Sequence, residues 1–322
     1  MKKALRIILA LVTLLVVSGV VTYVWAAVKT SGMLSRTIET HVVDFPVPFP
    51  LPEEERPALS PGEDAAAVAL RGARERGRHL VEARYGCIEC HGQSFAGGVM
   101  VDDPMLGSIL GPNLTMGVGS KVLAYRASDW DRAVRHGVKP GGLPSVMPSA
   151  DFVLMSDQEL SDIVAYIQSM PPVDNEVPAV RLGPLGTMLA ALGQLPLAAD
   201  LIESHSTEHL RIPPLAEVSV DFGRHLAGVC TGCHHEDLAG GPITGGDPSW
   251  APSRNLTPHV EGLAGWTYQD FRRVLLEGRR PDGTAVLEPM TLMRPYAENM
   301  TDVEMEALWA YLQSVPPVAN RQ

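Results

Sequence analysis

The sequence is short of positive charge, of strand patterns and of cysteine. Lysine and arginine number 26 against 37 aspartates and glutamates, so the formal net charge is −11. This balance does not favour nucleic acid as a partner. No strand pattern is as strong as the helical patterns, which predicts an all-α fold. The four cysteines are all confined to two short runs.

Both runs have the pattern Cys-x-x-Cys-His, at residues 87–91 and 230–234. The pattern is the attachment signature of c-type haem, in which two thiols bond to the haem and the histidine binds its iron. A zinc site made of all four cysteines would not explain why a histidine follows both pairs. A thioredoxin-like redox site needs only one Cys-x-x-Cys pair, so it would not explain the second. The sequence therefore predicts two covalently bound haems c. The predicted attachment residues are Cys87, Cys90, Cys230 and Cys233, and the predicted iron ligands are His91 and His234.

The N-terminus is basic and then apolar. Lys2, Lys3 and Arg6 precede an uncharged run from Ile7 to Val28. A membrane-spanning helix needs about 20 residues, and the apolar core of a cleaved signal has about 7–15. We therefore favour a retained single-pass anchor in the inner membrane over a cleaved signal. The positive-inside rule places the rest of the chain in the periplasm.

Two parts of the chain repeat one another. Residues 77–80 and 223–226 are both Gly-Arg-His-Leu, and Asn-Leu-Thr occurs at 113–115 and at 255–257. Helix-capping boxes are predicted at Ser128 to Asp131 and Thr267 to Asp270, and again at Ser156 with Glu159 and Thr301 with Glu304. The predicted domains are an anchor (1–30), a proline-rich stalk (31–60), a first helical unit (61–173), a connector (174–218) and a second unit (219–322).

The prolines of residues 45–52 favour an extended, stiff stalk, and an extended segment packed along the first unit is the alternative. His205, His209 and His225 lie in or near the connector and suggest a metal site. We expect these three histidines to be solvated or hydrogen-bonded and not to bind a metal.

The sixth iron ligand decides between electron transfer and catalysis. Histidine with methionine gives a closed site suited to carrying electrons. In the first unit the predicted ligand is Met147, in a proline-framed loop. In the second unit Met293 is preferred, Met290 is the alternative, and a histidine such as His259 is a third candidate.

These elements together give the chain a recognisable likeness. It resembles membrane-anchored dihaem class I cytochromes c, related to the cytochrome subunits of periplasmic alcohol and sugar dehydrogenases. In the first unit the likeness rests on residues 87–91, 113–115, 135–137 (Arg-His-Gly), 147–148 (Met-Pro) and 166–172. In the second unit it rests on residues 230–234, 255–257, 300–302 and 311–317.

The resemblance implies two tandem class I cytochrome c-like domains. In each, the first and last helices should cross where a glycine meets an aromatic residue, at Gly77 with Tyr166 and at Gly223 with Tyr311. A backbone carbonyl of residues 111–114 should accept a hydrogen bond from the first axial histidine.

The second unit departs from this pattern, because Ser253 and Arg254 stand where the first has Gly111 and Pro112. This change and the displaced methionine predict that the two haems differ in potential.

The predicted function is electron transfer, as a carrier or as the cytochrome subunit of a redox complex. We expect neither enzyme catalysis nor a small-molecule substrate. The expected partners are redox proteins: a dehydrogenase, a quinol-oxidising complex, an oxidase or a soluble cytochrome. The alternative is a dihaem peroxidase, which needs one haem with an open distal face. The irregular loop around Met293 keeps that alternative open.

Overall fold

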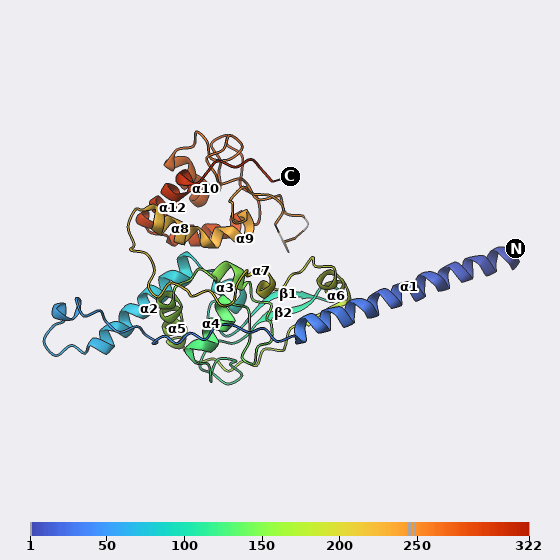
Figure 1. Cartoon of the computed structure of the whole chain (residues 1–322), viewed down its shortest axis with the longest axis horizontal. Coiled ribbons are helices and arrows are strands. Elements are labelled where there is room, and N and C mark those ends of the chain that lie inside the picture. Colours follow the sequence, from blue (N-terminus) through green and yellow to red (C-terminus); the bar gives the residue numbers. More distant parts are fainter. Residues whose placement is uncertain (1, 244–245, 248, 322) are drawn as a thin grey trace.

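The computed structural model describes residues 2–243, 246–247 and 249–321. Two helical units lie one above the other, and helix α1 projects away from them (Figure 1). The first unit contains α2 (Ala65–Ala83), α3 (Cys87–His91), α4 (Ala127–Arg135) and α5 (Asp157–Gln168). The second contains α8 (Val220–Ala227), α9 (Thr231–His234), α10 (Tyr268–Glu277), α11 (Arg294–Asn299) and α12 (Asp302–Ser314). Short helices η1 (Arg56–Ala58), η2 (Ser149–Phe152), η3 (Gly228–Cys230) and η4 (Met290–Met293) complete the units, and α6 (Pro184–Ala191) and α7 (Ala198–Leu201) lie in the connector.

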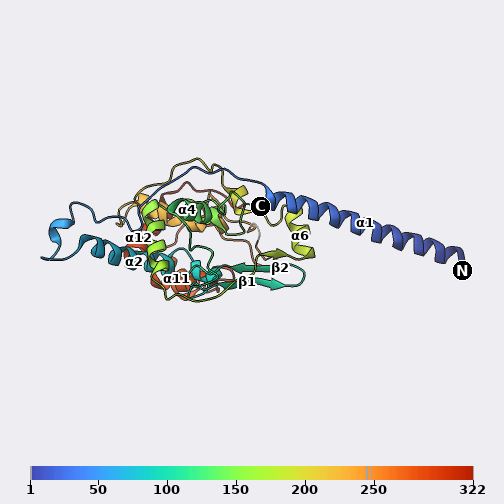
Figure 2. The same cartoon turned by 90° about the horizontal axis from the view of Figure 1, so that it is seen from below.

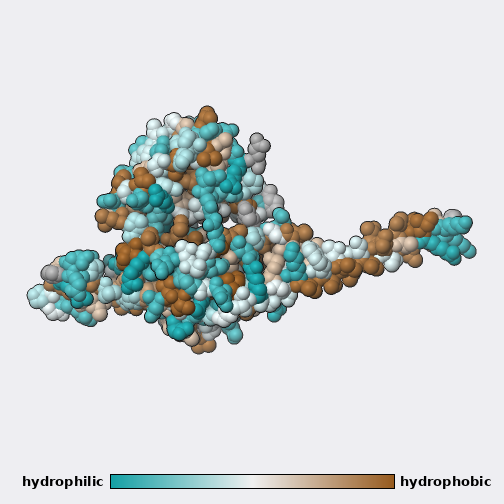
Figure 3. Space-filling model, in the orientation of Figure 1, coloured by the Kyte–Doolittle hydropathy of each residue, from teal (hydrophilic) through white to brown (hydrophobic). Residues whose placement is uncertain are grey.

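Helix α1 (Lys2–Ser35) is long and apolar enough to cross a membrane, with a mean hydropathy of 2.6 over an 18-residue window. Its side chains form an apolar rod that ends in a polar tip (Figure 3). Its last turns contact the connector, where the hydroxyl of Thr30 donates to the carbonyl of Thr187 in α6 at 3.0 Å. Seen from below, the helix still points away from both units (Figure 2).

The first and last helices of each unit cross at a glycine. A Cβ at Gly77 would lie 2.0 Å from the carbonyl oxygen of Asp162 and 2.9 Å from Cβ of Tyr166. A Cβ at Gly223 would lie 2.0 Å from the corresponding carbonyl of Ala307 and 2.7 Å from Cβ of Tyr311. The predicted crossings are confirmed in both units, and only glycine allows such a close backbone approach.

The repeated Asn-Leu-Thr element holds the segment that follows the last helix. Asn113 accepts from the backbone N–H of Thr115 at 2.9 Å and donates to the carbonyl of Val173 at 2.8 Å. Asn255 accepts from Thr257 at 2.8 Å and donates to the carbonyl of Val318 at 2.7 Å. The two asparagines are buried, so each satisfies backbone groups that water does not reach.

The fold is mainly helical, but it is not entirely α. Strands β1 (Gly98–Asp103), β2 (Gly107–Gly111) and β3 (Arg181–Leu182) form an antiparallel sheet in the order β1-β2-β3. Most residues of β1 are exposed, so the strand has no alternation of apolar and polar residues that the sequence could reveal.

The boxes at Ser156 with Glu159 and at Thr301 with Glu304 are confirmed, as is that at Thr267. The box predicted from Ser128 to Asp131 is wrong, because α4 begins two residues earlier. The side chain of Asp129 instead accepts from the backbone N–H of Arg126. Asp131 is fully buried and pairs with Arg135 on the same helix, so it does not cap.

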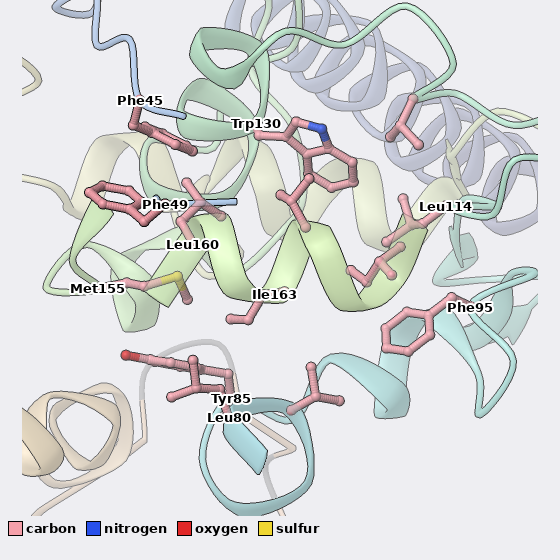
Figure 4. Close-up of a cluster of buried hydrophobic side chains, with 14 residues drawn as sticks. Phe45, Phe49, Leu80, Tyr85, Phe95, Leu114, Trp130, Met155, Leu160 and Ile163 are labelled. Atoms are coloured by element: carbon pink, nitrogen blue, oxygen red, sulfur yellow. The ribbon is translucent and has the colours of Figure 1, made fainter. Parts of the chain in front are cut away.

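The segment after α1 packs against the first unit. Phe45 and Phe49 are 4% and 7% exposed, and they lie against the same face of α5 as Leu160 (Figure 4). The hydroxyl of Ser161 donates to the carbonyl of Pro46 at 2.7 Å. Over residues 38–49 the structure therefore has the alternative, an extended segment packed along the first unit, and not a free stalk. Alternate prolines keep this segment extended, as expected, but the phenylalanines between them are buried in the core.

Candidate functional site

Each Cys-x-x-Cys-His run forms a short helical turn, and both histidines are 8% exposed. Nδ1 of His91 lies 3.0 Å from the carbonyl oxygen of Pro112, and Nδ1 of His234 lies 2.6 Å from that of Arg254. A carbonyl only accepts hydrogen bonds, so Nδ1 donates in both units and Nε2 keeps its lone pair. Burial lowers the pKa of both histidines. Each imidazole is therefore neutral and held in one orientation, as an iron ligand needs to be. The carbonyl acceptor predicted for the first unit is confirmed, and the second unit has an equivalent one.

An apolar cavity adjoins the first motif. Figure 4 labels some of the residues that line it, among them Trp130, Met155 and Ile163. The cavity brings together Cys87, His91 and Met147, which the sequence separates by up to 60 positions. The remaining lining is apolar: Leu114, Trp130, Val134, Phe152, Met155, Leu160, Ile163 and Ile167. The thiol of Cys87, the imidazole of His91 and the thioether of Met147 thus meet at one apolar space, as one attachment thiol and both iron ligands of the predicted haem would. The second predicted attachment residue, Cys90, does not line this cavity.

The cysteines do not have the properties of reactive thiols. Burial raises the pKa of Cys87 and of Cys230 to about 12. Neither thiol is therefore the readily ionised nucleophile that a thioredoxin-like redox site uses.

The second unit places its two candidate methionines at opposite ends of η4. Met290 is partly buried and Met293 is 43% exposed. The other candidate, His259, is partly exposed, and its Nδ1 accepts from the backbone N–H of Glu261 at 3.2 Å. This contact lies within the loop of the Asn-Leu-Thr element.

The segment after the candidate methionine in each unit contacts the haem motif of the other. The hydroxyl of Tyr296 in α11 donates to Glu89, inside the first motif, at 2.7 Å. Asp151 in η2 lies against Gly232, inside the second motif, where a Cβ would be 2.1 Å from its Oδ1. Both motifs therefore lie at the boundary between the units.

Equivalent residues of the two repeats also pair across that boundary. Nε2 of His79 lies 2.9 Å from Glu304, and Nε2 of His225 lies 2.8 Å from Glu159. Reciprocal contacts of this kind are the mark of a two-fold interface. Arg84 lies between the two carboxylates and pairs with both.

Burial alone would raise the pKa of both carboxyl groups. The hydrogen bonds from His225 and His79 and the charge of Arg84 outweigh burial, and they lower the pKa of Glu159 and of Glu304 to about 2. Both carboxylates are therefore charged at neutral pH. This cluster was not predicted from the sequence, although the repeated Gly-Arg-His-Leu motif and the repeated capping glutamates were its signal.

The comparisons with known proteins agree with this geometry. The family model described as Cytochrome c matches residues 74–171 and again residues 221–316. The alcohol dehydrogenase (quinone) cytochrome c subunit of Gluconacetobacter polyoxogenes is 30% identical over 299 residues, which cover 82% of this chain and 59% of that protein. The gluconate 2-dehydrogenase cytochrome c subunit of Pantoea cypripedii is 28% identical over 276 residues, 75% of this chain and 59% of that protein.

A further relative is the diheme cytochrome c-type protein of Cereibacter sphaeroides. It is 26% identical over 277 residues, which cover 78% of this chain and 88% of that protein. The chain thus spans about three fifths of the length of the two dehydrogenase subunits and most of the length of the diheme protein.

The predicted resemblance is confirmed, and the comparisons do not support the peroxidase alternative. The duplicated family match and the two equivalent histidine sites lead to one conclusion. The chain belongs to the cytochrome c family and is a dihaem cytochrome c.

Proposed function

We propose that the protein carries electrons at the periplasmic face of the inner membrane, from a dehydrogenase to a respiratory acceptor. The observation that carries this proposal is the similarity to dehydrogenase cytochrome subunits over four fifths of the chain. Helix α1 would anchor the protein, and both units would lie outside the membrane. In this proposal the domains keep the predicted bounds, except that residues 38–49 belong structurally to the first unit.

The first haem would be bound through Cys87 and Cys90, with His91 and Met147 as iron ligands. The second would be bound through Cys230 and Cys233, with His234 and Met293, and Met290 is the alternative. When bound, haem c supplies an iron that cycles between the ferric and ferrous states. The chain excludes water and holds each histidine in one orientation. A closed methionine-ligated site suits electron transfer and not peroxide chemistry.

Electrons would pass between the two units inside the protein. The contacts of Tyr296 with Glu89 and of Asp151 with Gly232 support this step, because they place both motifs at one boundary. The buried cluster around Arg84 would fix the relative orientation of the units. A fixed orientation keeps the distance between the haems constant during turnover.

The methionine ligands are tested by spectroscopy of the oxidised, purified protein. Met147→Leu should remove the methionine–iron charge-transfer band of one haem. Met155→Leu is the matched control, because Met155 lines the same cavity, is 1% exposed and belongs to the core; this near-isosteric swap should cost less than about 1.5 kcal/mol. In the second unit, whichever of Met293→Leu and Met290→Leu removes the remaining band identifies the ligand. Bands that stay unchanged in Met147→Leu, Met290→Leu and Met293→Leu would contradict methionine ligation.

The electron donor is tested in membranes that contain the full chain. Ethanol, gluconate or fructose is added without oxygen, and haem reduction is followed by its visible absorption. If a dehydrogenase is the partner, one of these substrates should reduce the haems quickly. This absorption change should be lost when this chain alone is deleted. Reduction only by an added quinol would identify a free-standing carrier instead. Haems that neither a substrate nor a quinol reduces would contradict the proposed function.

A further inference from the structure

Four side chains from three separate segments meet beside α4. His41 comes from the segment after α1, Asp131 lies in α4, His136 directly follows that helix, and His209 comes from the connector. One nitrogen or oxygen from each residue lies within 4.8 Å of the others. The side chains of Asp131 and His136 are fully buried, and those of His209 and His41 are 6% and 14% exposed. Such a cluster must satisfy its polar atoms internally.

The hydrogen bonds around the cluster fix which nitrogens carry protons. Nδ1 of His41 donates to the carbonyl of His205 at 3.0 Å, which leaves a lone pair on Nε2. Nε2 of His205 donates to the carbonyl of Ala199 at 3.0 Å, so Nδ1 of that ring is an acceptor. Nδ1 of His136 lies 3.1 Å from this acceptor and donates to it. The Nε2 atoms of His41 and His136 therefore both present lone pairs to the cluster.

Neighbouring donor atoms are spaced as ligands of one small cation are. Nε2 of His209 lies 3.2 Å from Nε2 of His136, and the carboxylate of Asp131 lies 3.7–3.8 Å from each of the three histidines. A tetrahedral zinc ion with ligands at about 2.0–2.1 Å places neighbouring ligand atoms about 3.3 Å apart. Within the described residues, Nε2 of His41 and Oδ2 of Asp131 are buried without a hydrogen-bond partner. A proton could bridge only one pair of these atoms, whereas a cation satisfies all four.

The charges around the cluster also favour a cation. Arg135 donates from Nε to Oδ1 of Asp131 at 2.8 Å and pairs through Nη1 with Asp157 at 2.9 Å. Two carboxylates and one guanidinium leave one buried negative charge. Arg135 also orients the carboxylate, so that Oδ2 faces away from the ion pair.

We propose that His41, Asp131, His136 and His209 bind one divalent cation, with zinc as the class that three imidazoles and one carboxylate suit. Four protein ligands make a closed site, which is structural and not catalytic. From outside the site, the backbone carbonyl of His205 orients His41 and its ring orients His136. The ion ties the segment after α1 and the connector to the first unit. The sequence led us to expect only hydrogen-bonded or solvated histidines here.

The test uses the full, haem-loaded chain in detergent. The protein is equilibrated with zinc chloride and dialysed against a weak chelator, and the zinc-to-iron ratio is measured by plasma mass spectrometry. We expect one zinc for two irons. His41→Ala and His209→Ala should lose the zinc, and His205→Ala should weaken its binding by about 10–100-fold. His259→Ala is the matched control, because that histidine lies in the second unit and should leave zinc binding unchanged.

Zinc absorption-edge spectroscopy of the wild-type protein checks the ligands independently of any variant. We expect four nitrogen or oxygen neighbours at about 2.0–2.1 Å, with the outer-shell signal of imidazole. The haem spectrum of each variant reports whether it has folded. Wild-type protein without zinc, or zinc that the His41 and His209 variants retain, would overturn the proposal. So would sulfur neighbours of the zinc in the wild-type protein.

Discussion

Replacing Glu159 by glutamine removes one charge from the buried cluster between the two units. Glutamine is compatible with the capping box that Glu159 forms with Ser156, so the change isolates the charge. Arg84 and His225 would then lose a buried anionic partner. Breaking one side of a buried ion pair costs about 3–5 kcal/mol. The fall in the pKa of Glu159 from 4.5 to about 2 corresponds to a loss of unfolding free energy on the order of 3 kcal/mol.

The assay is urea unfolding of the haem-loaded protein at pH 7, followed by circular dichroism. Glu298→Gln is the control, because its pair with Arg294 is half exposed and is worth about 0.5 kcal/mol. The folded-state pKa of Glu159 is lowered, so its contribution is complete above about pH 4.5 and is lost as the pH falls towards 2. The difference between wild type and Glu159→Gln should shrink over the same range. A Glu159→Gln protein as stable as the control at pH 7 would refute the reasoning.

Two further predictions concern the helix crossing and the contact of η2 with the second motif. Gly77→Ala should cost about 3 kcal/mol or more in the same assay, because the new Cβ would meet the backbone of Asp162. Gly72→Ala lies on the same helix, where a Cβ would meet only the end of a flexible arginine side chain, so it should raise the unfolding free energy by up to about 1 kcal/mol. Equal changes in the two variants would contradict the close helix crossing at Gly77. Burial raises the pKa of Asp151 from 3.8 to about 6, so the folded state favours the neutral form and stability is lost as the pH rises between these values. Asp151→Asn should therefore raise the unfolding free energy at pH 7.5 by up to about 3 kcal/mol, and a gain of the same size at pH 4 would contradict that cause.

The elements that were predicted well are those that the resemblance to class I cytochromes c implies. The resemblance implied the crossing at Gly77 and the carbonyl partner of His91, and the structure has both. Duplication strengthened each inference, because chance matches do not recur in the same order.

The elements that the sequence did not predict depend on which surfaces meet. Residues 98–111 form strands without an apolar face, held by backbone hydrogen bonds. The meeting of His41 with His209 depends on packing between segments 168 residues apart, and no local pattern encodes it. The reciprocal pairs of His79 and His225 were visible as a repeat, but only the structure shows that they face the other unit.

The central claim is that this chain holds two haems c that both carry electrons. An anaerobic redox titration of the purified full chain, with iron and protein measured on the same sample, tests it most directly. We expect two irons per chain and two low-spin haems that are fully reducible. We also expect two separate potentials, because the second unit has Ser253 and Arg254 where the first has Gly111 and Pro112. One iron per chain, or a haem that stays high-spin through the titration, would contradict this expectation, and a single unsplit potential would remove the predicted difference between the units.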